Sequence, residues 1–383
     1  MFPLILVGVI VVRVTMKKRI AIITNIPSPY RVGQFINLQN KILEYEFFFI
    51  FSDKGDKERS WDVNLEGLRN AVFLNSKPLM LKTKSEVRGY YLSLDVIKTL
   101  NSISPDVVIV CEYNMISIQA FLYCKIKKIK VISMTDGTLY SERNFGFFRR
   151  LNRRMMIPRA DMCIASSTKS KELQMHYGAR EERIIIAFLT VDVDYFRFER
   201  EKYHSHKLLF IGSLIERKGI DLLLKALSLV KKDYTLTIVG DGEEKSRLVD
   251  YVEQNGMKEL VEFVPFKQKE ELREIYNTHD IFILPTREDC FGLVISEAMA
   301  ASMPVISSCY ADGAYDLVID GENGYIVNPY DSVKFANTIE KLIANDELVE
   351  KMGKASFEII NRFSFDRTSE AIGKAINRAL DNI

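Results

Sequence analysis

The chain of 383 residues is long for one domain and suits two, and its hydrophobic fraction of 47% suffices for two packed cores. Its five cysteines are widely spaced without a C-x-x-C pair, so the sequence predicts neither a disulfide framework nor a zinc knuckle and favours a reduced cytoplasmic compartment. The formal net charge of +2 hides an asymmetry, because residues 1–190 hold 29 Lys and Arg against 17 Asp and Glu, whereas the remainder holds 24 against 34. An anionic partner for the first half is one interpretation, and chance variation of surface charge is the other.

The first fifteen residues are apolar but form a poor membrane span, which needs about 20 apolar residues, and Arg13 interrupts them. They also match a cleaved signal peptide poorly, because they lack a basic start and a small-residue cleavage site. We interpret Met16 as the true start and residues 1–15 as a mis-called extension. A weak membrane anchor is the alternative.

From residue 18 onward, short β-branched runs alternate with longer amphipathic ones. In the first half, the predicted strands are 19–24, 46–51, 106–110, 130–134, 162–165 and 183–187, and the predicted helices are 32–43, 117–128 and 168–177. Strands that are apolar throughout and alternate with helices are typical of a parallel sheet covered on both faces.

The second half repeats the alternation more clearly. The predicted strands are 207–211, 234–239, 261–264, 280–284, 304–307 and 324–327, and the predicted helices are 219–230, 243–255, 269–278, 293–301 and 331–344. Residues 192–206 are polar and aperiodic, so they are predicted as a linker between domains 1–191 and 207–365. We expect residues 366–383 to form a helix that packs back towards the first domain. The predicted fold class is therefore α/β, with two doubly wound, Rossmann-like parallel-sheet domains facing a central cleft.

The densest group of candidate functional residues lies within residues 287–300. Amides near Gly292 and Leu293 fall at the predicted start of a helix, where a phosphate is a natural ligand and glycine permits its close approach. Glu297, one turn further along the same face, can accept hydrogen bonds from ribose hydroxyls, and Asp289 can accept them from hexose hydroxyls. A capped helix whose acids merely complement its dipole is the alternative.

A second candidate phosphate site begins at Gly212, directly after another predicted strand. Arg217 and Lys218 there offer adjacent positive charges to a diphosphate. A basic pair at a helix start opposes the helix dipole, and such local conflicts are expected at functional sites. The plain alternative is a solvated pair of charges.

Four segments in this order carry a family resemblance: Gly212…Arg217-Lys218-Gly219, Gly240-Asp241-Gly242, Asp289-x-Phe291-Gly292…Glu297 and Gly321-Glu322-Asn323-Gly324. With them, residues 205–345 resemble the carboxyl-terminal domain of the group 1 (family 4) retaining glycosyltransferases, which have the GT-B fold. The amino-terminal half matches more weakly, through residues 27–31 and 178–196. The resemblance implies an enzyme that transfers a sugar, with retention and without a metal or other cofactor, from a nucleoside diphosphate sugar to a saccharide or lipid-linked saccharide. Its expected setting is the synthesis of cell-surface polysaccharide or glycoconjugate.

The resemblance also implies residue roles. Arg217 and Lys218 would bind the donor diphosphate and assist departure of the leaving group, and Glu297 would bind ribose. Asp289 stands where the family has the first acid of its E-x7-E pattern, and it would contact the transferred sugar with a side chain one methylene shorter. The other expected donor-binding residues are Gly212, Ser213, Phe266 as a wall near the base, Phe291, Gly292 and Leu293.

A histidine that many relatives place after a middle strand of the first domain has no counterpart here. The corresponding loops offer Glu112 and Asp136, which are therefore the acceptor-side candidates, together with Tyr30. Asp136 is counted among the catalytic candidates, with a role as base. The alternative for each acid is a loop carboxylate bonded to the backbone.

Residues 143–159 hold six arginines, three phenylalanines and no acid. This pattern suits a helix on an anionic lipid surface, with membrane-facing side chains at Arg149, Arg150, Arg153 and Arg154. A buried amphipathic helix is the alternative, and nucleic acid is disfavoured because many relatives act on lipid-linked acceptors. We therefore expect peripheral contact with the inner face of the plasma membrane.

Two similar motifs are set aside. Asp192-Val193-Asp194 matches the D-x-D metal motif of another glycosyltransferase fold but lies in the expected linker, and His204 with His206 lacks a third ligand. Two other functions stay open: a non-hydrolysing sugar-nucleotide epimerase, which would need no acceptor, and a non-catalytic protein that binds sugar nucleotides.

Overall fold

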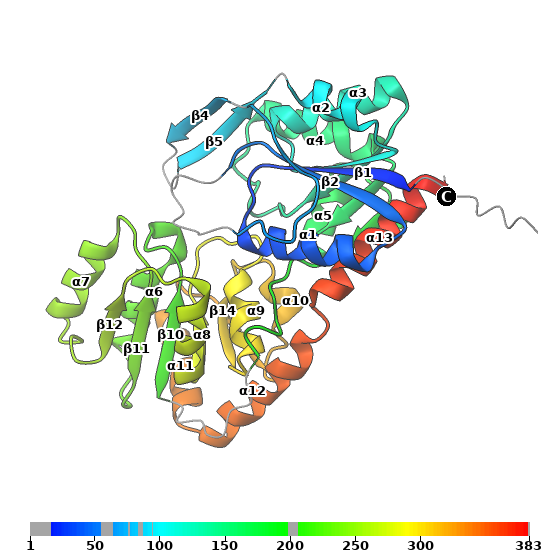
Figure 1. Cartoon of the computed structure of the whole chain (residues 1–383). Coiled ribbons are helices and arrows are strands. Elements are labelled where there is room, and N and C mark those ends of the chain that lie inside the picture. Colours follow the sequence, from blue (N-terminus) through cyan, green and yellow to red (C-terminus); the bar gives the residue numbers. More distant parts are fainter. Residues whose placement is uncertain are drawn as a thin grey trace, which may run out of the picture.

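The computed structural model describes residues 17–54, 64–75, 77–82, 87–93, 95–197 and 206–381. The chain forms two domains, one above the other in Figure 1, and each contains a parallel sheet between helices. The predicted fold class of two doubly wound domains is confirmed. The expected extension at residues 1–15 lies outside the described residues.

The amino-terminal domain has a sheet of seven parallel strands in the order β3-β2-β1-β6-β7-β8-β9. Ala21 and Ile23 of β1 belong to one hydrophobic cluster with α2, α3 and α5, whereas Ile20 and Ile22 belong to another with α1 and α13. Alternate side chains of a strand point to opposite faces, so covering both faces requires apolar strands. The strands are β1 (Lys18–Thr24), β2 (Tyr45–Phe51), β3 (Ala71–Phe73), β6 (Val107–Cys111), β7 (Lys130–Thr135), β8 (Met162–Ala165) and β9 (Ile184–Ile186), and the helices are α1 (Pro29–Lys41), α2 (Asp95–Ile103), α3 (Met115–Lys127), α4 (Phe147–Met156) and α5 (Thr168–His176).

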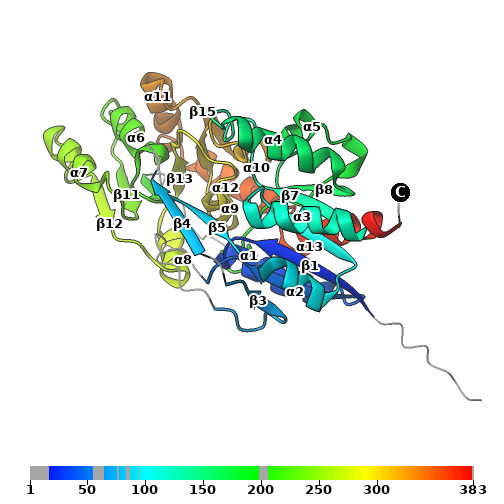
Figure 2. The same ribbon diagram turned by 90° about the horizontal axis from the view of Figure 1, so that it is seen from above.

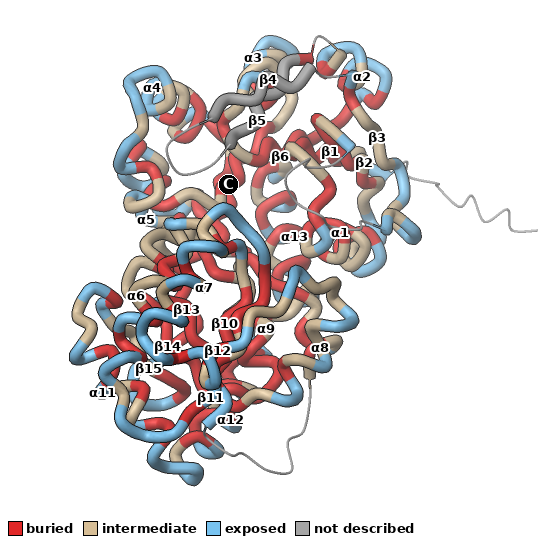
Figure 3. The backbone as a smooth tube through the Cα atoms, turned by 90° about the vertical axis from the view of Figure 1, so that its left-hand side faces the viewer, coloured by how far each residue is buried: buried red, intermediate tan, exposed pale blue. Residues whose placement is uncertain are grey.

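The carboxyl-terminal domain has six parallel strands in the order β12-β11-β10-β13-β14-β15 around one hydrophobic cluster. The central strands β10, β13 and β14 are buried in the interior of this domain, the lower one in Figure 3. The strands are β10 (Lys207–Ile211), β11 (Thr235–Val239), β12 (Val261–Val264), β13 (Ile281–Leu284), β14 (Val305–Ser308) and β15 (Gly324–Val327), and the helices are α6 (Ile220–Leu227), α7 (Lys245–Gln254), α8 (Lys269–Thr278), α9 (Leu293–Ala300), α10 (Ala314–Leu317), α11 (Ser332–Ile343) and α12 (Asp346–Ile360).

Each sheet reverses its strand order at one point, between β1 and β6 in the first domain and between β10 and β13 in the second. In doubly wound sheets, ligands bind beyond the carboxyl ends of the strands at this switch point. The loops after these four strands are therefore the places to look for a site.

The two domains are also joined by the last helix, α13 (Phe365–Asp381), which leaves the second domain and packs along α1 of the first (Figure 1). Ile372 and Ile376 of α13 are buried in the core of the first domain. Lys41 of α1 forms an ion pair with Asp366, with 2.9 Å between Nζ and Oδ2. Helix α13 thus packs the carboxyl-terminal segment against the first domain.

The expected linker at residues 192–206 needs a correction. Val193 and Phe196 are buried in the core of the second domain, and Arg273 Nε donates to the carbonyl of Tyr195 at 2.8 Å. Apolar side chains alternate here with charged ones, so the segment contains no long apolar run that would predict its packing. Residues 198–205 lie outside the described residues.

Three short strands were not predicted from the sequence: β3, and the antiparallel pair β4 (Lys77–Lys82) and β5 (Val87–Leu92). Proline and glycine interrupt this pair, so it lacks the continuous apolar runs of the central strands. Figure 2 shows α3, α4 and α5 on the side of the first sheet that faces the viewer. In the part of the chain that the structure describes, no helix combines the length and apolar character needed to span a bilayer.

Candidate functional site

The turn after β10 forms the first part of the candidate donor site. It runs through a 3-10 turn at Glu216–Lys218 to Gly219, whose φ of 70° is left-handed. A Cβ atom at Gly219 would lie 2.2 Å from the carbonyl oxygen of Pro285, which follows β13. Only glycine fits, and it brings the two loops at the switch point into contact.

These loops share a pair of opposite charges. Lys218 Nζ lies 2.6 Å from Asp289 Oδ2, and the two side chains are 15% and 16% exposed. Arg217 reaches the same loop, donating from Nη1 to the carbonyl of Glu288 at 2.8 Å. The two groups that the sequence indicated separately are therefore one site.

The charge of Asp289 is fixed by this pairing. Burial alone would raise its pKa, but the positive charges of Lys218 and Arg217 and the hydrogen bonds from Lys218 and the Phe291 amide lower it to about 2. Asp289 is therefore ionised at any physiological pH. Two cations and one carboxylate at this point leave an excess of positive charge, which suits a diphosphate.

Helix α9 begins beside these charges. Its N-cap is Gly292, with a left-handed φ of 79°. Phe291 is buried, so its side chain contributes to packing and only its main chain is available to a ligand. Leu293 is partly buried, whereas Ser213 is exposed.

Glu297, on the first turns of α9, accepts a hydrogen bond from the hydroxyl of Tyr276 at 2.7 Å. Burial raises the pKa of Glu297 to about 7, although the Tyr276 hydroxyl and the charge of Lys269 oppose the rise. Tyr276 lies on another helix, α8, so no local sequence pattern predicts it as a partner of Glu297. Phe266 is 39% exposed, and its amide donates to Asp241 Oδ2 at 2.8 Å.

On the acceptor side, Asp136 at the end of β7 is held by Arg31 of α1. Arg31 Nη2 lies 2.7 Å from Asp136 Oδ1 and 2.6 Å from Oδ2, and Arg31 is buried. Burial alone would lower the pKa of Arg31, but the Asp136 charge keeps it above its ordinary value. Arg31 belongs to the segment 27–31 that carries the amino-terminal resemblance, but the sequence does not predict it as a site residue. Tyr30 next to it packs against the core of the other domain.

Glu112 lies beside this pair at the end of β6. Its φ of 69° is left-handed, which is costly for a residue with a Cβ and is found disproportionately at functional sites. The amide of Asp136 lies 3.5 Å from Glu112 Oε1. Burial and the charge of Asp136 raise the pKa of Glu112 to about 7, against the effect of Arg153. Of the two candidate acceptor-side acids, Glu112 is therefore the one whose pKa is raised towards neutral pH.

The prediction that Arg153 faces a membrane is wrong. Its Nε lies 2.5 Å from Glu142 Oε2, with side chains 7% and 4% exposed, and its guanidinium stacks at 4.7 Å on Tyr113 and on Phe145. A buried carboxylate requires a counter-charge, so this face of α4 turns inward. Arg149 is partly buried, and Arg150 and Arg154 are exposed.

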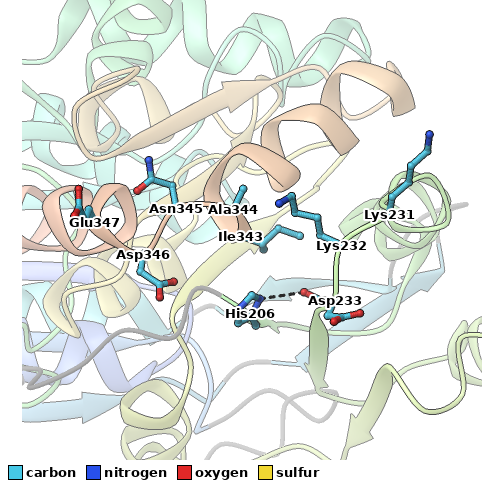
Figure 4. A pocket seen from close by; sticks show the side chains of 9 residues that line it. All are labelled: His206, Lys231, Lys232, Asp233, Ile343, Ala344, Asn345, Asp346 and Glu347. Atoms are coloured by element: carbon cyan, nitrogen blue, oxygen red, sulfur yellow. Dashed lines mark hydrogen bonds between the residues drawn. The ribbon is translucent and has the colours of Figure 1, made fainter.

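A hollow with a volume of about 540 Å³ lies elsewhere in the second domain. Figure 4 shows its lining, which includes His206, Lys232 and Asp346. It lies where β10 and β11 begin, at the sheet edge opposite the loops described above. Its mixed charges indicate no particular ligand.

The segment that contains these candidate donor-site loops is similar in sequence to a known family. Residues 193–358 match the model of the family described as "Glycosyl transferases group 1". The second domain is therefore similar to group 1 glycosyltransferases over this stretch. The chain is 28% identical over 173 residues to an "Uncharacterized glycosyltransferase" of Methanocaldococcus jannaschii, a match that covers 45% of this chain and 48% of that protein. It is 24% identical over 246 residues to a "D-inositol 3-phosphate glycosyltransferase" of Corynebacterium diphtheriae, covering 58% of this chain and 57% of the relative. The chain thus spans about half of the length of the curated relatives it matches.

Solved structures extend the likeness over both domains. Anabaena Alr3699/HepE in complex with UDP superposes with a TM-score of 0.76 at 18% identity, covering 94% of this chain and 100% of that one. Sucrose-phosphate synthase of Thermosynechococcus elongatus superposes with a TM-score of 0.74 at 16% identity, covering 96% and 100%. At such identities the likeness concerns the fold, which is GT-B.

Glu297 gives a pH-dependent prediction. The folded protein keeps this carboxyl protonated up to a pKa of about 7, whereas the unfolded chain ionises it near its ordinary value of 4.5. Stability is therefore lost as pH rises through this window. We predict that Glu297→Gln raises the melting temperature more at pH 8 than at pH 5, as measured by differential scanning calorimetry.

The matched control is Glu274→Gln, an exposed acid on α8, for which no such difference between pH 5 and pH 8 is expected. An equal effect of Glu297→Gln at both pH values would contradict the assignment.

Proposed function

We propose that the protein transfers a sugar from a nucleoside diphosphate sugar to a saccharide or lipid-linked saccharide acceptor, with retention and without a metal, in the synthesis of a cell-surface polysaccharide or glycoconjugate. The observation that carries the proposal is the convergence of Arg217, Lys218 and Asp289 at the switch point of the second sheet. Two cations, one acid and the start of a helix meet there.

The cations would hold the donor diphosphate. Negative charge grows on the diphosphate as the bond to the sugar breaks, so contacts with Arg217 and Lys218 strengthen in the transition state and accelerate the reaction. The amides at the start of α9, beside Gly292, would add donors to the same oxygens. Lys218 supplies from the protein the charge that a metal would otherwise supply.

The acids would orient the rest of the donor. Asp289 stays ionised and can accept hydrogen bonds from hexose hydroxyls, and Glu297 with Tyr276 can bind ribose hydroxyls. On the acceptor side, Glu112 is better suited than Asp136 to take a proton, because Asp136 is engaged by Arg31. Asp136, held by Arg31, would then face the acceptor as a hydrogen-bond acceptor.

The relatives support the donor class. HepE has been solved with UDP and with UDP-glucose, and a pneumococcal O-GlcNAc transferase with UDP and GlcNAc superposes with a TM-score of 0.72. A sugar nucleotide is therefore the donor class to test first.

Removing either donor-site cation should cripple turnover. We predict that Arg217→Ala and Lys218→Ala each lower kcat for sugar transfer by about 10²-fold or more, because each removes charge stabilisation in the transition state. Release of nucleoside diphosphate in the presence of acceptor measures this. Lys225→Ala, an exposed lysine on α6, is the matched control and should behave like the parent protein.

Near-parental turnover of either variant would disprove the phosphate site. In the same assay, the anomeric configuration of the product tests retention, and activity in EDTA tests metal independence. Interconversion of the nucleotide sugar without any acceptor would instead indicate an epimerase.

We also propose peripheral contact with an anionic membrane through the exposed side of α4. Phe147 and Phe148 are 72% and 78% exposed, and Leu151 is 47% exposed. Arg150 and Arg154 lie exposed on the same helix, which is at the periphery of the first domain in Figure 3. Exposed aromatic rings beside cations suit the boundary between headgroups and acyl chains, and such contact would bring a lipid-linked acceptor to the enzyme.

Two double variants test this contact separately from the fold. We predict that Arg150→Gln with Arg154→Gln weakens binding to vesicles of phosphatidylglycerol about 30-fold, because each arginine contributes about 1 kcal/mol. Phe147→Ser with Phe148→Ser should also weaken it. Co-sedimentation measures the binding, which should fall as salt is raised.

Arg362→Gln, an exposed arginine of the second domain, is the control and should bind as the parent does. Parental binding by both double variants, or no binding by the parent at low salt, would contradict the membrane proposal.

A further inference from the structure

The loop between β7 and α4 contacts the donor-site loop of the other domain. Thr138 Oγ1 donates to Asp312 Oδ2, and the hydroxyl of Tyr140 donates to the carbonyl of Arg287 at 3.3 Å. The ring of Tyr140 stacks on that of Tyr310, with centroids 5.3 Å apart and planes 25° apart. We call these contacts, with the pair described next, the interdomain clasp.

Arg143 completes the clasp. Its Nη1 lies 2.5 Å from Glu288 Oε2, with side chains 38% and 22% exposed. Its guanidinium also lies 3.8 Å from the centre of the Tyr140 ring and donates to the Tyr140 carbonyl, so it is held in place from its own domain. Such anchoring reduces the loss of side-chain entropy when the ion pair forms.

Glu288 connects this contact to the donor site. While its carboxylate pairs with Arg143, its carbonyl accepts the hydrogen bond from Arg217 at 2.8 Å and another from Thr286 Oγ1 at 2.9 Å. The next residue is Asp289, the partner of Lys218. Glu288 thus contacts the other domain through its side chain, and through its backbone it contacts Arg217, which we propose binds the diphosphate.

The other clasp contacts also end beside Asp289. Its amide donates to the carbonyl of Tyr310 at 3.0 Å, and its carbonyl accepts from the Asp312 amide at 2.9 Å. The clasp loop itself begins just after Asp136 on the acceptor side. The clasp therefore fixes the spacing between the two halves of the site.

We propose that Arg143 is a positioning residue, whose pairing with Glu288 holds the two domains closed and sets the Glu288 carbonyl that orients Arg217. The expected effect on catalysis rests on the proposed function, whereas the closure of the two domains does not. A single, partly exposed ion pair is weak and screened by salt, which suits a contact that opens to admit substrates and closes for the reaction.

Charge reversal tests the proposal, because each single variant places like charges together and the double variant restores a pair of opposite charges. Arg143→Glu and Glu288→Arg should each lower kcat/KM for transfer about tenfold or more, since small misplacements of reacting groups are costly. Arg143→Glu with Glu288→Arg in one chain should return kcat/KM to within about threefold of the parent. Lys225→Glu, outside the clasp, is the control for added negative charge.

Small-angle X-ray scattering provides a readout that needs no activity. The single variants should show a larger radius of gyration than the parent, and the double variant should recover the parental value; circular dichroism checks that all remain folded. Unchanged scattering in folded single variants, or no recovery in the double variant, would overturn the proposal. Recovery of the scattering in a protein without transferase activity would support the clasp and count against the proposed function alone.

Discussion

The ion pair between Lys218 and Asp289 is the interaction on which the rest of the site depends. It joins the loop after β10 to the loop after β13, where the strand order reverses. Gly219 makes the approach sterically possible, and the glycine at the start of α9 lets the second loop turn into a helix. An unpaired charge at this depth would be costly, and the pairing with Lys218 keeps Asp289 ionised by lowering its pKa to about 2.

The first domain also pairs carboxylates with positive charges, but its cations are arginines. It contains two ion pairs near the end of its sheet, Arg31 with Asp136, which is partly exposed, and the buried pair of Arg153 with Glu142. These pairs compensate two carboxylates and leave Glu112 between them with a raised pKa. The arrangement leaves one acid with a raised pKa beside the strand ends of the first sheet.

Much of the fold could be predicted from the sequence, because apolar strands and amphipathic helices alternate with clear periods. The sequence also indicates two groups of candidate donor residues, at 212–218 and 289–297, because each group lies after a predicted strand and contains a glycine. Partners distant in the chain could not: Arg31 and Asp136 are 105 residues apart, and no local pattern links them. Arg153 was misassigned because helical periodicity shows which residues share a face but not which face is buried. Val193 and Phe196 were placed in a linker because charged neighbours masked their packing.

We propose that the second domain binds a nucleoside diphosphate sugar through the charges after β10 and β13. The most direct measurement is thermal unfolding in the presence of UDP-, GDP- and ADP-sugars. At a hundredfold excess over the dissociation constant, a true donor should stabilise the protein by about 2.7 kcal/mol. We expect this stabilisation in the parent protein and its loss in Lys218→Ala. No stabilisation by any of these sugar nucleotides, or equal stabilisation of Lys218→Ala, would contradict the proposal.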